Sequence, residues 1–300
     1  MQRLRISHST EYQFAGVVTL EPHKLLLRPR EGHDVHIESS RLTISPAHAV
    51  KWHRDVFDNS VAIVHFTEPA DRLTIQSDVL INHFESAPLD FVVEDYTLNY
   101  PFQYQLEDRA DLLPYQQPAY PNCEHRVAEW VRSFGFGSGP IETYAMLDRM
   151  NRAIAAGFVF SVREAEGVQR PIETLETRAG ACRDFAALFV DACRYQGLAA
   201  RFVSGYSHGP ATEAGNASTH AWAEVYLPSV GWRGFDPTNG CLVDLDHIRV
   251  ASGRNYRDAT PTAGTLYAGG HGERLEVSVR VKRIEEATGP EADARQQAQQ

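Results

Sequence analysis

The sequence contains few cysteines, and none of them belongs to a closely spaced pair. Four occur among 300 residues: Cys123, Cys182, Cys193 and Cys241. Structural zinc sites are usually built from short-spaced pairs such as Cys-x-x-Cys, so these thiols do not predict a zinc site. In a reducing compartment, cysteines this far apart are expected to stay free and not to form disulfides.

Long apolar runs are also missing. No stretch approaches the roughly 18 apolar residues of a membrane span, and the opening MQRLRISHSTEYQF alternates apolar and polar residues instead of forming the apolar segment of a signal peptide. Positive charge is scarce, since 29 basic against 39 acidic residues give a net charge of −10. The sequence therefore predicts a cytoplasmic protein without nucleic-acid or membrane partners.

Residues 1–90 have the alternating pattern of β-strands. Segments such as RLRISHSTEY, VHIESSRLTIS and RLTIQSDVLI are separated by turn signals such as FDN and TEPADR. In the first segment, one period-two face consists of Leu4, Ile6, His8, Thr10 and Tyr12. Many short strands at close spacing predict an N-terminal β-sandwich-like domain over this range.

The remainder of the chain predicts an α+β arrangement. Residues 91–122, rich in Tyr, Pro and Gln, are expected to form a linker with little regular structure. In the core, residues 123–270, helical segments precede the strand-like pieces AARFVSGY, HAWAEVYL and GWRGFDPT. Residues 271–284 alternate as a C-terminal strand that we expect to pair with the N-terminal sheet, and residues 285–300 predict a disordered tail.

Two cysteines lie in one predicted helix, 179-AGACRDFAALFVDACRYQG-197. The helix is expected to begin near Ala181 and to end before Gly197. Cys182 lies in its first turn, where unpaired backbone N–H groups and the helix dipole favour a thiolate and could stabilise an oxyanion. Gly180 would let a substrate backbone approach closely. On position alone, Cys182 is equally compatible with a small buried core residue.

Cys193 is the other thiol of this helix. Eleven residues are about three turns, so the two thiols point to a similar side but lie ~16 Å apart along the axis, too far for a disulfide. We expect Cys193 to be a core residue, and nothing distinguishes Cys123 or Cys241 from the same assignment.

A nucleophilic cysteine needs a histidine as its acid and base. Of thirteen histidines, His220 opens a predicted strand directly after the polar segment 207–219, where substrate could reach it. Asp236 ends the next strand, and its carboxylate could orient the imidazole. A turn aspartate at a strand end is the alternative assignment for Asp236.

The assignment of Asp236 depends on the hairpin register. His220 and Asp236 share a face only if even positions pair with even ones. Such a register pairs Trp222 with Asp236 and Tyr226 with Trp232, leaving residues 227–231 as a five-residue loop. A tight loop at residues 229–230 would pair odd with even and contradict the assignment.

Three ordered segments resemble the core of the transglutaminase-like superfamily: 180-GACRDFAALF-189, 219-THAWAEVYLP-228 and 231-GWRGFDPTNG-240. The segments ISHSTEYQFA, HKLLLRPR and DVFDNSV are similar to the N-terminal β domain of bacterial members, although the turn has Asp58 where a glycine is usual. The resemblance implies a papain-like arrangement with Cys182 as nucleophile, His220 as general acid and base, and Asp236 as the residue that orients His220.

The activity implied by the resemblance is amide acyl transfer through a thioester, most simply hydrolysis by a cysteine protease or amidase acting on a peptide or protein. Two alternatives stay open, a transglutaminase or deamidase and a non-catalytic peptide-binding scaffold. No cofactor or metal is expected, since neither an EF-hand-like loop nor a nucleotide-binding glycine loop occurs. Trp222 and Gly180 are candidate substrate-binding residues, and a homo-oligomer is compatible with the sequence.

Overall fold

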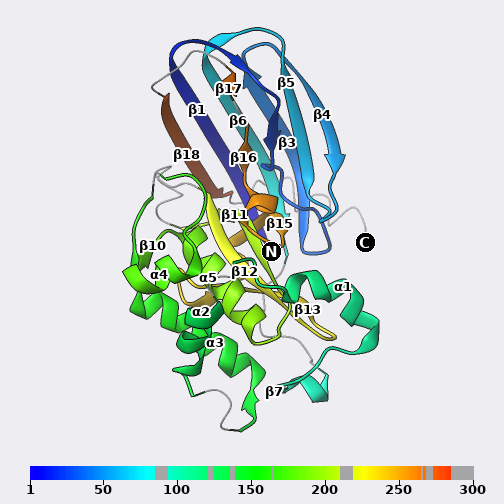
Figure 1. The fold of residues 1–300 in the computed structure, drawn as a ribbon. Helices are drawn as coiled ribbons and strands as arrows, with labels where there is room; N and C mark the ends of the chain where they lie inside the picture. Colours follow the sequence, from blue (N-terminus) through cyan, green and yellow to red (C-terminus); the bar gives the residue numbers. More distant parts are fainter. Residues whose placement is uncertain are drawn as a thin grey trace, which may run out of the picture.

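The computed structural model describes residues 1–84, 94–120, 124–135, 139–163, 165–209, 219–264, 266–267 and 273–284. Its N-terminal part consists of two antiparallel sheets (Figure 1). The first has the order β17-β1-β6-β3, with β18 also pairing with β1, and the second has the order β16-β2-β5-β4. The strands of the first sheet are β1 (Gln2–Leu20), β3 (Val35–Ser45), β6 (Ala70–His83), β17 (Leu266–Tyr267) and β18 (Glu273–Arg283). Those of the second are β2 (His23–Leu25), β4 (His48–Arg54), β5 (Ser60–Phe66) and β16 (Thr262–Ala263).

The alternation of β1 determines which of its side chains enter the core. Leu4, Ile6, His8 and Thr10 are buried and Tyr12 is half-buried, as the period-two pattern predicts. Further along, Phe14 of β1 and Ile75 of β6 pack with Ala62 of the facing sheet in one hydrophobic cluster. Side chains of both sheets fill a shared interior, so the prediction of a β-sandwich-like domain is confirmed.

The C-terminal strand returns to the N-terminal sheet, as expected from its alternation. β18 runs antiparallel to β1, from the pair Leu4–Arg283 to the pair Phe14–Glu273. The first sheet therefore contains both the beginning and the end of the described chain.

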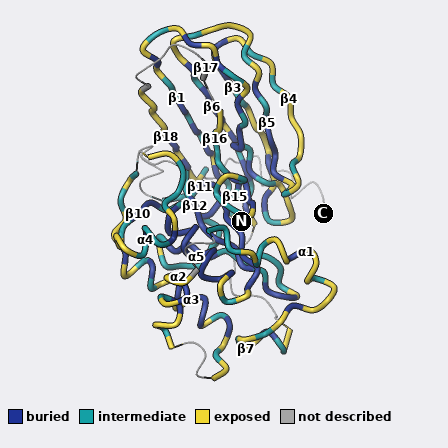
Figure 2. The backbone as a smooth tube through the Cα atoms, in the orientation of Figure 1, coloured by how far each residue is buried: buried dark blue, intermediate teal, exposed yellow. Residues whose placement is uncertain are grey.

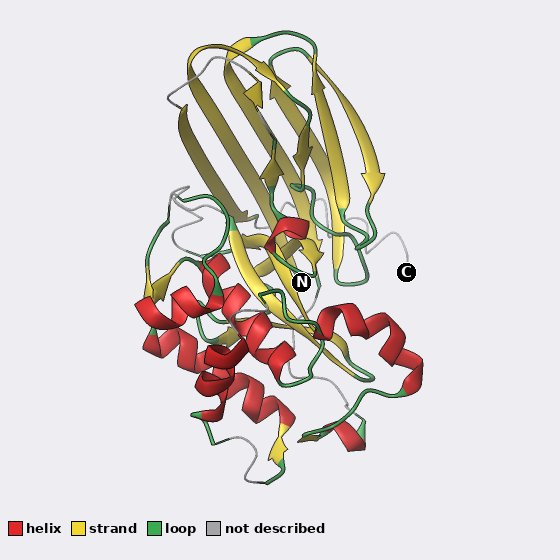
Figure 3. Cartoon of the chain, in the orientation of Figure 1, coloured by secondary structure: helices red, strands yellow, loops and turns green. Residues whose placement is uncertain are grey.

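The second part packs helices against a five-stranded sheet of order β14-β13-β12-β11-β15 (Figure 3). Its strands are β11 (Ala200–Ser207), β12 (His220–Leu227), β13 (Gly231–Asp236), β14 (Cys241–Leu242) and β15 (His247–Gly253). The helices are α2 (Glu124–Arg132), α3 (Thr143–Gly157), α4 (Pro171–Thr177) and α5 (Cys182–Tyr195), and short pieces are β8 (Ile141–Glu142), β9 (Val159–Phe160), β10 (Ala179–Gly180) and η3 (Tyr256–Ala259). No helix among the described residues is long and apolar enough to cross a membrane.

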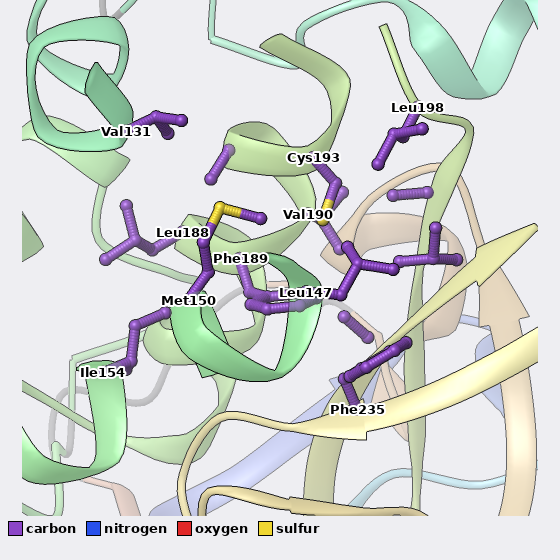
Figure 4. Packing of buried hydrophobic residues seen from close by; sticks show 14 of the residues in the cluster. Val131, Leu147, Met150, Ile154, Leu188, Phe189, Val190, Cys193, Leu198 and Phe235 are labelled. Carbon is purple, nitrogen blue, oxygen red and sulfur yellow. The ribbon is translucent and has the colours of Figure 1, made fainter. Parts of the chain in front are cut away.

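Helix α5 lies at the centre of this part, and every one of its residues from Asp184 to Arg194 is buried. Phe189 of α5 stacks on Phe235 of β13, with ring centroids 5.5 Å apart. Cys193 is fully buried in the same cluster, beside Leu147 and Val190 (Figure 4). The assignment of Cys193 to the core is thus confirmed, and α5 is fixed from one end to the other by packing.

The two parts share a hydrophobic core. Ile6 of β1 and Val281 of β18 belong to the same cluster as Ala186 of α5 and Ile248 of β15. The burial pattern accordingly continues from the lower sandwich strands into β11 and β15 (Figure 2). The sandwich therefore supports the sheet and helix that carry the predicted catalytic residues.

The predicted linker contains more regular structure than its composition suggests. Within residues 91–122, the structure has η1 (Asp95–Thr97), β7 (Asn99–Tyr100) and helix α1 (Leu106–Gln116). Helix α1 holds a proline, Pro114, and buries Leu112 alone. Such a helix leaves little periodic signal in the sequence. It contacts the core through a cluster of Leu112 with Tyr104 and Ala199, and Ala199 is distant along the chain.

Candidate active site

Cys182 is the first residue of α5, as the sequence predicts. The preceding residue, Ala181, is extended, with φ −89° and ψ 171°. Its backbone N–H donates to Oδ2 of Asp184, at 2.8 Å, and this bond fixes the start of the helix. Asp184 was not singled out from the sequence, although an acidic residue three positions after the N-cap is a recognised signal of a helix start.

Two arginines hold the segment that precedes the thiol. Arg163 Nε donates to Asp184 Oδ2 at 2.8 Å, and this carboxylate is fully buried. Arg183 donates to the backbone carbonyls of Arg163 and Ala165, each at 2.8 Å, and of Gly167 at 2.7 Å. The first turn of α5 is thereby pre-organised around the half-buried thiol of Cys182.

His220 is the first residue of β12 and lies between the thiol and a carboxylate. Its Nε2 lies 2.8 Å from Asp236 Oδ2, and the side chain also hydrogen-bonds to Cys182. Burial opposes protonation of the ring, but the bonds to Asp236 and Cys182 outweigh it and raise the pKa of His220 to about 10. A charged imidazolium is therefore favoured next to the thiol at neutral pH.

The hairpin register satisfies the requirement set by the pleat. Tyr226 pairs with Trp232, and continuing the same register places Trp222 opposite Asp236. The predicted loop length is wrong, because Leu227 and Gly231 also pair and leave the three residues 228–230 between them. The shorter loop is possible because Ser229 and Gly231 both adopt positive φ, 66° and 80°.

Asp236 is fully buried and accepts hydrogen bonds on both oxygens. Oδ1 accepts from the backbone N–H of Thr238 at 2.9 Å and of Asn239 at 3.3 Å. Oδ2 accepts from His220 and from Asn239 Nδ2, the latter at 2.7 Å. Burial alone would raise the pKa of this carboxyl, but the hydrogen bonds from His220 and His247 hold it well below its usual range.

A second histidine on Asp236 was missed by the sequence reasoning. His247, the first residue of β15, lies with Nε2 at 3.1 Å from Asp236 Oδ2 and with Nδ1 at 3.0 Å from Asp244 Oδ1. No local pattern distinguishes it from the other histidines, because β15 pairs with β11 and its contact with β13 exists only in the folded chain. Two further residues, His247 and Asp244, therefore extend the hydrogen-bonded Cys-His-Asp arrangement.

Three potential metal-ligand atoms, from His220, Asp236 and His247, lie within 4.8 Å of one another. Two imidazole N–H groups here donate to one carboxylate oxygen, so hydrogen bonding accounts for the cluster without a cation. A cavity of about 370 Å³ has Trp222, Glu224 and His247 in its wall, but neither Cys182 nor His220 lines it. This cavity is therefore not where the thiol chemistry would take place.

The two candidate substrate-binding residues are buried. Trp222 is 0% exposed and packs behind the histidines, with ring centroids 6.1 Å from His220 and 5.5 Å from His247. Gly180 is also buried, and a Cβ there would meet Asp184 Cβ at 2.9 Å. Both positions have packing reasons of their own, and their contact with substrate stays a prediction.

The remaining cysteines have environments unlike that of Cys182. Burial raises the pKa of the Cys193 thiol far above its usual value. Burial and the nearby Asp236 charge raise the pKa of Cys241 to about 11. Cys123 lies outside the described residues. The thiols of Cys193 and Cys241 are therefore not suited to nucleophilic attack at neutral pH.

We expect Gly205→Ala to loosen the support of His220. Gly205 pairs with His220 across β11 and β12, and a Cβ there would lie 2.2 Å from the Ile248 carbonyl oxygen and 2.6 Å from Trp222 Cη2. Overpacking of this kind typically costs about 1–3 kcal/mol. Urea denaturation would measure the loss. As a matched control, Gly16→Ala, whose Cβ meets nothing within 4 Å, should change the free energy of unfolding little.

Comparisons with known proteins show which family the chain resembles. Residues 4–82 match the bacterial transglutaminase-like N-terminal region, and residues 133–237 match the transglutaminase-like superfamily. Uncharacterised proteins of Mycobacterium tuberculosis and Mycobacterium bovis are each 33% identical to this chain over 300 residues, covering 93% of it and 92% of their own length. An uncharacterised protein of Mycobacterium leprae is 27% identical over 290 residues, covering 95% of this chain and 100% of its own.

The fold has a solved counterpart. The crystal structure of a "putative cysteine protease" from Cytophaga hutchinsonii superposes with a TM-score of 0.72 at 17% identity, covering 96% of this chain and 93% of that one. The likeness extends over both the sandwich and the helix-on-sheet part. Together with the matched regions and the mycobacterial relatives, it shows that this chain belongs to the transglutaminase-like superfamily, with the N-terminal region of the bacterial members.

Proposed function

We propose that this protein hydrolyses peptide or amide bonds through a thioester on Cys182. The observation that carries the proposal is the continuous chain of hydrogen bonds from Cys182 through His220 to Asp236, in which one ring nitrogen serves the sulfur and the other the carboxylate. This arrangement supplies the three functions that a thiol hydrolase needs: a nucleophile, a proton carrier and a group that orients it.

The expected reaction has two steps. In the first, the Cys182 sulfur attacks the amide carbonyl carbon, the C–N bond breaks, and the His220 imidazolium gives its proton to the departing amine. In the second, His220 takes a proton from water and the resulting hydroxide attacks the thioester carbonyl carbon. The C–S bond then breaks, the acid leaves, and the Cys182 sulfur is released as a thiolate beside the protonated His220. The backbone N–H of Cys182, unpaired within the helix, is a donor for the oxyanion.

The same first step also serves a transferase. If an amine attacks the thioester instead of water, the product is a cross-linked or aminated glutamine, and if the substrate is a glutamine side chain, hydrolysis deamidates it. Incubating the protein with a glutamine-containing peptide library, with and without a primary amine, distinguishes these cases by mass. We expect shortened peptides; a gain of ~1 Da, from replacement of the amide nitrogen by oxygen, would show deamidation, and an amine adduct would show transfer.

A non-catalytic peptide-binding scaffold is the alternative from another class, and thiol labelling tests it. Near neutral pH, we expect iodoacetamide to modify Cys182 well before Cys193 and Cys241, because of these three described thiols Cys182 is the one that lies against a protonated histidine. The preference should disappear in His220→Ala. Equal, slow labelling of all four cysteines would contradict the proposal and favour the scaffold.

A further inference from the structure

We infer that His247, held by Asp244, is a positioning residue of the catalytic site: it acts on Asp236 through the same carboxylate oxygen that His220 contacts. The inference rests on the proposed function, because it assigns a role to groups around the same triad. It begins from contacts that the Cys-His-Asp arrangement does not require.

The geometry places Asp236 between two imidazole rings. Oδ2 lies 2.8 Å from His220 Nε2 and 3.1 Å from His247 Nε2. The two rings come from strands at opposite sides of β11, and their centroids are 6.1 Å apart. Each histidine therefore restricts rotation of the Asp236 carboxylate toward the other histidine. Asn239 Nδ2 donates to the same oxygen at 2.7 Å.

His247 is itself oriented on both sides. Nδ1 contacts Asp244 Oδ1 at 3.0 Å, while the side chain of His247 is only 5% exposed. The backbone N–H of Asp246 donates to Asp244 Oδ1 at 3.0 Å, and that of His247 donates to the Asp244 carbonyl at 3.0 Å. The backbone N–H of Asp244 also lies 3.3 Å from Nδ1. A tight turn thus places the Asp244 carboxylate and its backbone N–H at the far nitrogen, and both ring nitrogens are paired.

The charge of His247 follows from its neighbours. The titratable groups that face it are Asp236 of β13, Asp244 of the preceding turn and His220 of β12. Burial and the His220 charge oppose its protonation, but the two carboxylates outweigh them and raise the pKa of His247. A cationic His247 offsets part of the Asp236 charge, and so keeps the pKa of His220 lower, nearer the working pH, than Asp236 alone would set it.

A purely structural role is the competing explanation, since His247 also closes the turn between β14 and β15. The two roles differ in their effect on His220. A turn residue affects stability, whereas a positioning residue changes the reactivity of Cys182 and the titration of His220. Residues that orient a functional side chain through a hydrogen bond typically contribute about 10- to 100-fold to activity.

The experiment compares full-length His247→Gln, His247→Ala and Asp244→Asn with the unmodified protein. Circular dichroism checks the fold. Rates of Cys182 alkylation by iodoacetamide are read by peptide mass, and NMR titration of the histidine rings reads the pKa of His220. His208→Gln is the matched control, because His208 also contacts an aspartate, Asp246, at 3.1 Å, but does not contact Asp236.

We expect alkylation at pH 7 to fall about tenfold in His247→Ala, and less in His247→Gln, whose amide can still donate to Asp236. The pKa of His220 should rise in His247→Gln and, by a smaller amount, in Asp244→Asn, while His208→Gln leaves both readouts unchanged. Lost stability with an unchanged rate and an unchanged His220 titration would overturn the inference. Should the His247 variants fail to fold, Asp244→Asn decides alone, because the Asp244 side chain is 46% exposed.

These readouts need no substrate, so they separate this inference from the proposed function. Fast, His220-dependent labelling that responds to His247, together with no turnover of the peptide library, would refute hydrolysis and leave the positioning role intact. Labelling that does not depend on His220 would refute both, because there would be no ion pair for His247 to influence.

Discussion

Replacing Cys182 with serine is expected to abolish turnover, by at least about 10³-fold, while leaving the fold intact. A serine hydroxyl has a far higher pKa than a thiol, so it cannot form with His220 the ion pair that a thiol can form, and it remains a weak nucleophile. The substitution should cost little stability, because Cys182 is half-buried and lies at the edge of its hydrophobic cluster. Turnover of the cleaved library peptides measures the first effect, and urea denaturation the second.

The matched control is Cys241→Ser. Cys241 is also half-buried and lies opposite Asp236 in the pairing of β13 with β14, so it tests whether any thiol near the triad matters. Burial keeps the Cys241 thiol protonated, and we expect its replacement to preserve turnover and the fast phase of iodoacetamide labelling. A Cys182→Ser protein that turns over peptides at the rate of the unmodified chain would refute the thioester.

Local patterns sufficed to predict those parts of the fold in which each residue's neighbours in sequence are also its neighbours in space. The face of Leu4, Ile6, His8 and Thr10 follows from period two, and the start of α5 at Cys182 follows from the apolar periodicity after Gly180. The His220–Asp236 contact could be predicted only conditionally from the sequence: it required a hairpin register that pairs even positions with even ones, and the structure has that register.

The unpredicted features depend on contacts across strands that are distant along the chain. His247 reaches Asp236 because β15 pairs with β11 and not with the neighbouring β14, and sequence spacing does not reveal that order. Helix α1 forms although Pro114 and a nearly polar surface argue against it, because Leu112 packs with Tyr104 and Ala199. In both cases tertiary contacts outweigh local preference.

The shared core gives the N-terminal sandwich a physical role. Ala186, one turn after Cys182, packs in the same cluster as Ile6 and Val281, which belong to the first sandwich sheet. Tyr206 of β11 also contacts His8 of β1, with 3.0 Å between Oη and Nδ1. The sandwich therefore stabilises the helix that carries the thiol and the strand beside His220, so mutations in its core should affect the site through stability.

Asp236→Asn is the second substitution for which we expect a large effect, a fall in activity at pH 7 of about 10²- to 10⁴-fold. The asparagine is isosteric and can still accept from the backbone N–H groups of Thr238 and Asn239. It removes the negative charge that outweighs the burial of His220, so the pKa of His220 should fall from about 10 toward or below its usual 6.5. At neutral pH the imidazole would then be uncharged, and the thiol would lose its cationic partner.

The stability that this substitution removes should depend on pH in a defined way. Since the pKa of Asp236 is depressed in the folded state, its contribution is present above its unfolded value, about 3.9, and is lost as the pH falls toward the folded one. Since the pKa of His220 is raised, its contribution is complete below about 6.5 and is lost as the pH rises through about 10. The free energy of unfolding of the unmodified protein should therefore exceed that of Asp236→Asn most clearly between about pH 4 and 6.5, by about 2–4 kcal/mol.

Urea denaturation of both proteins at pH 5, 7 and 10 measures this difference. Asp246→Asn is the control, because Asp246 pairs with His208 at the surface with its side chain 43% exposed, and such pairs contribute at most about 1 kcal/mol. A difference of the same size at all three pH values would show that Asp236 matters through its shape and not its charge. Because the proposed mechanism needs the charge, that result, together with undiminished activity, would remove Asp236 from the catalytic site.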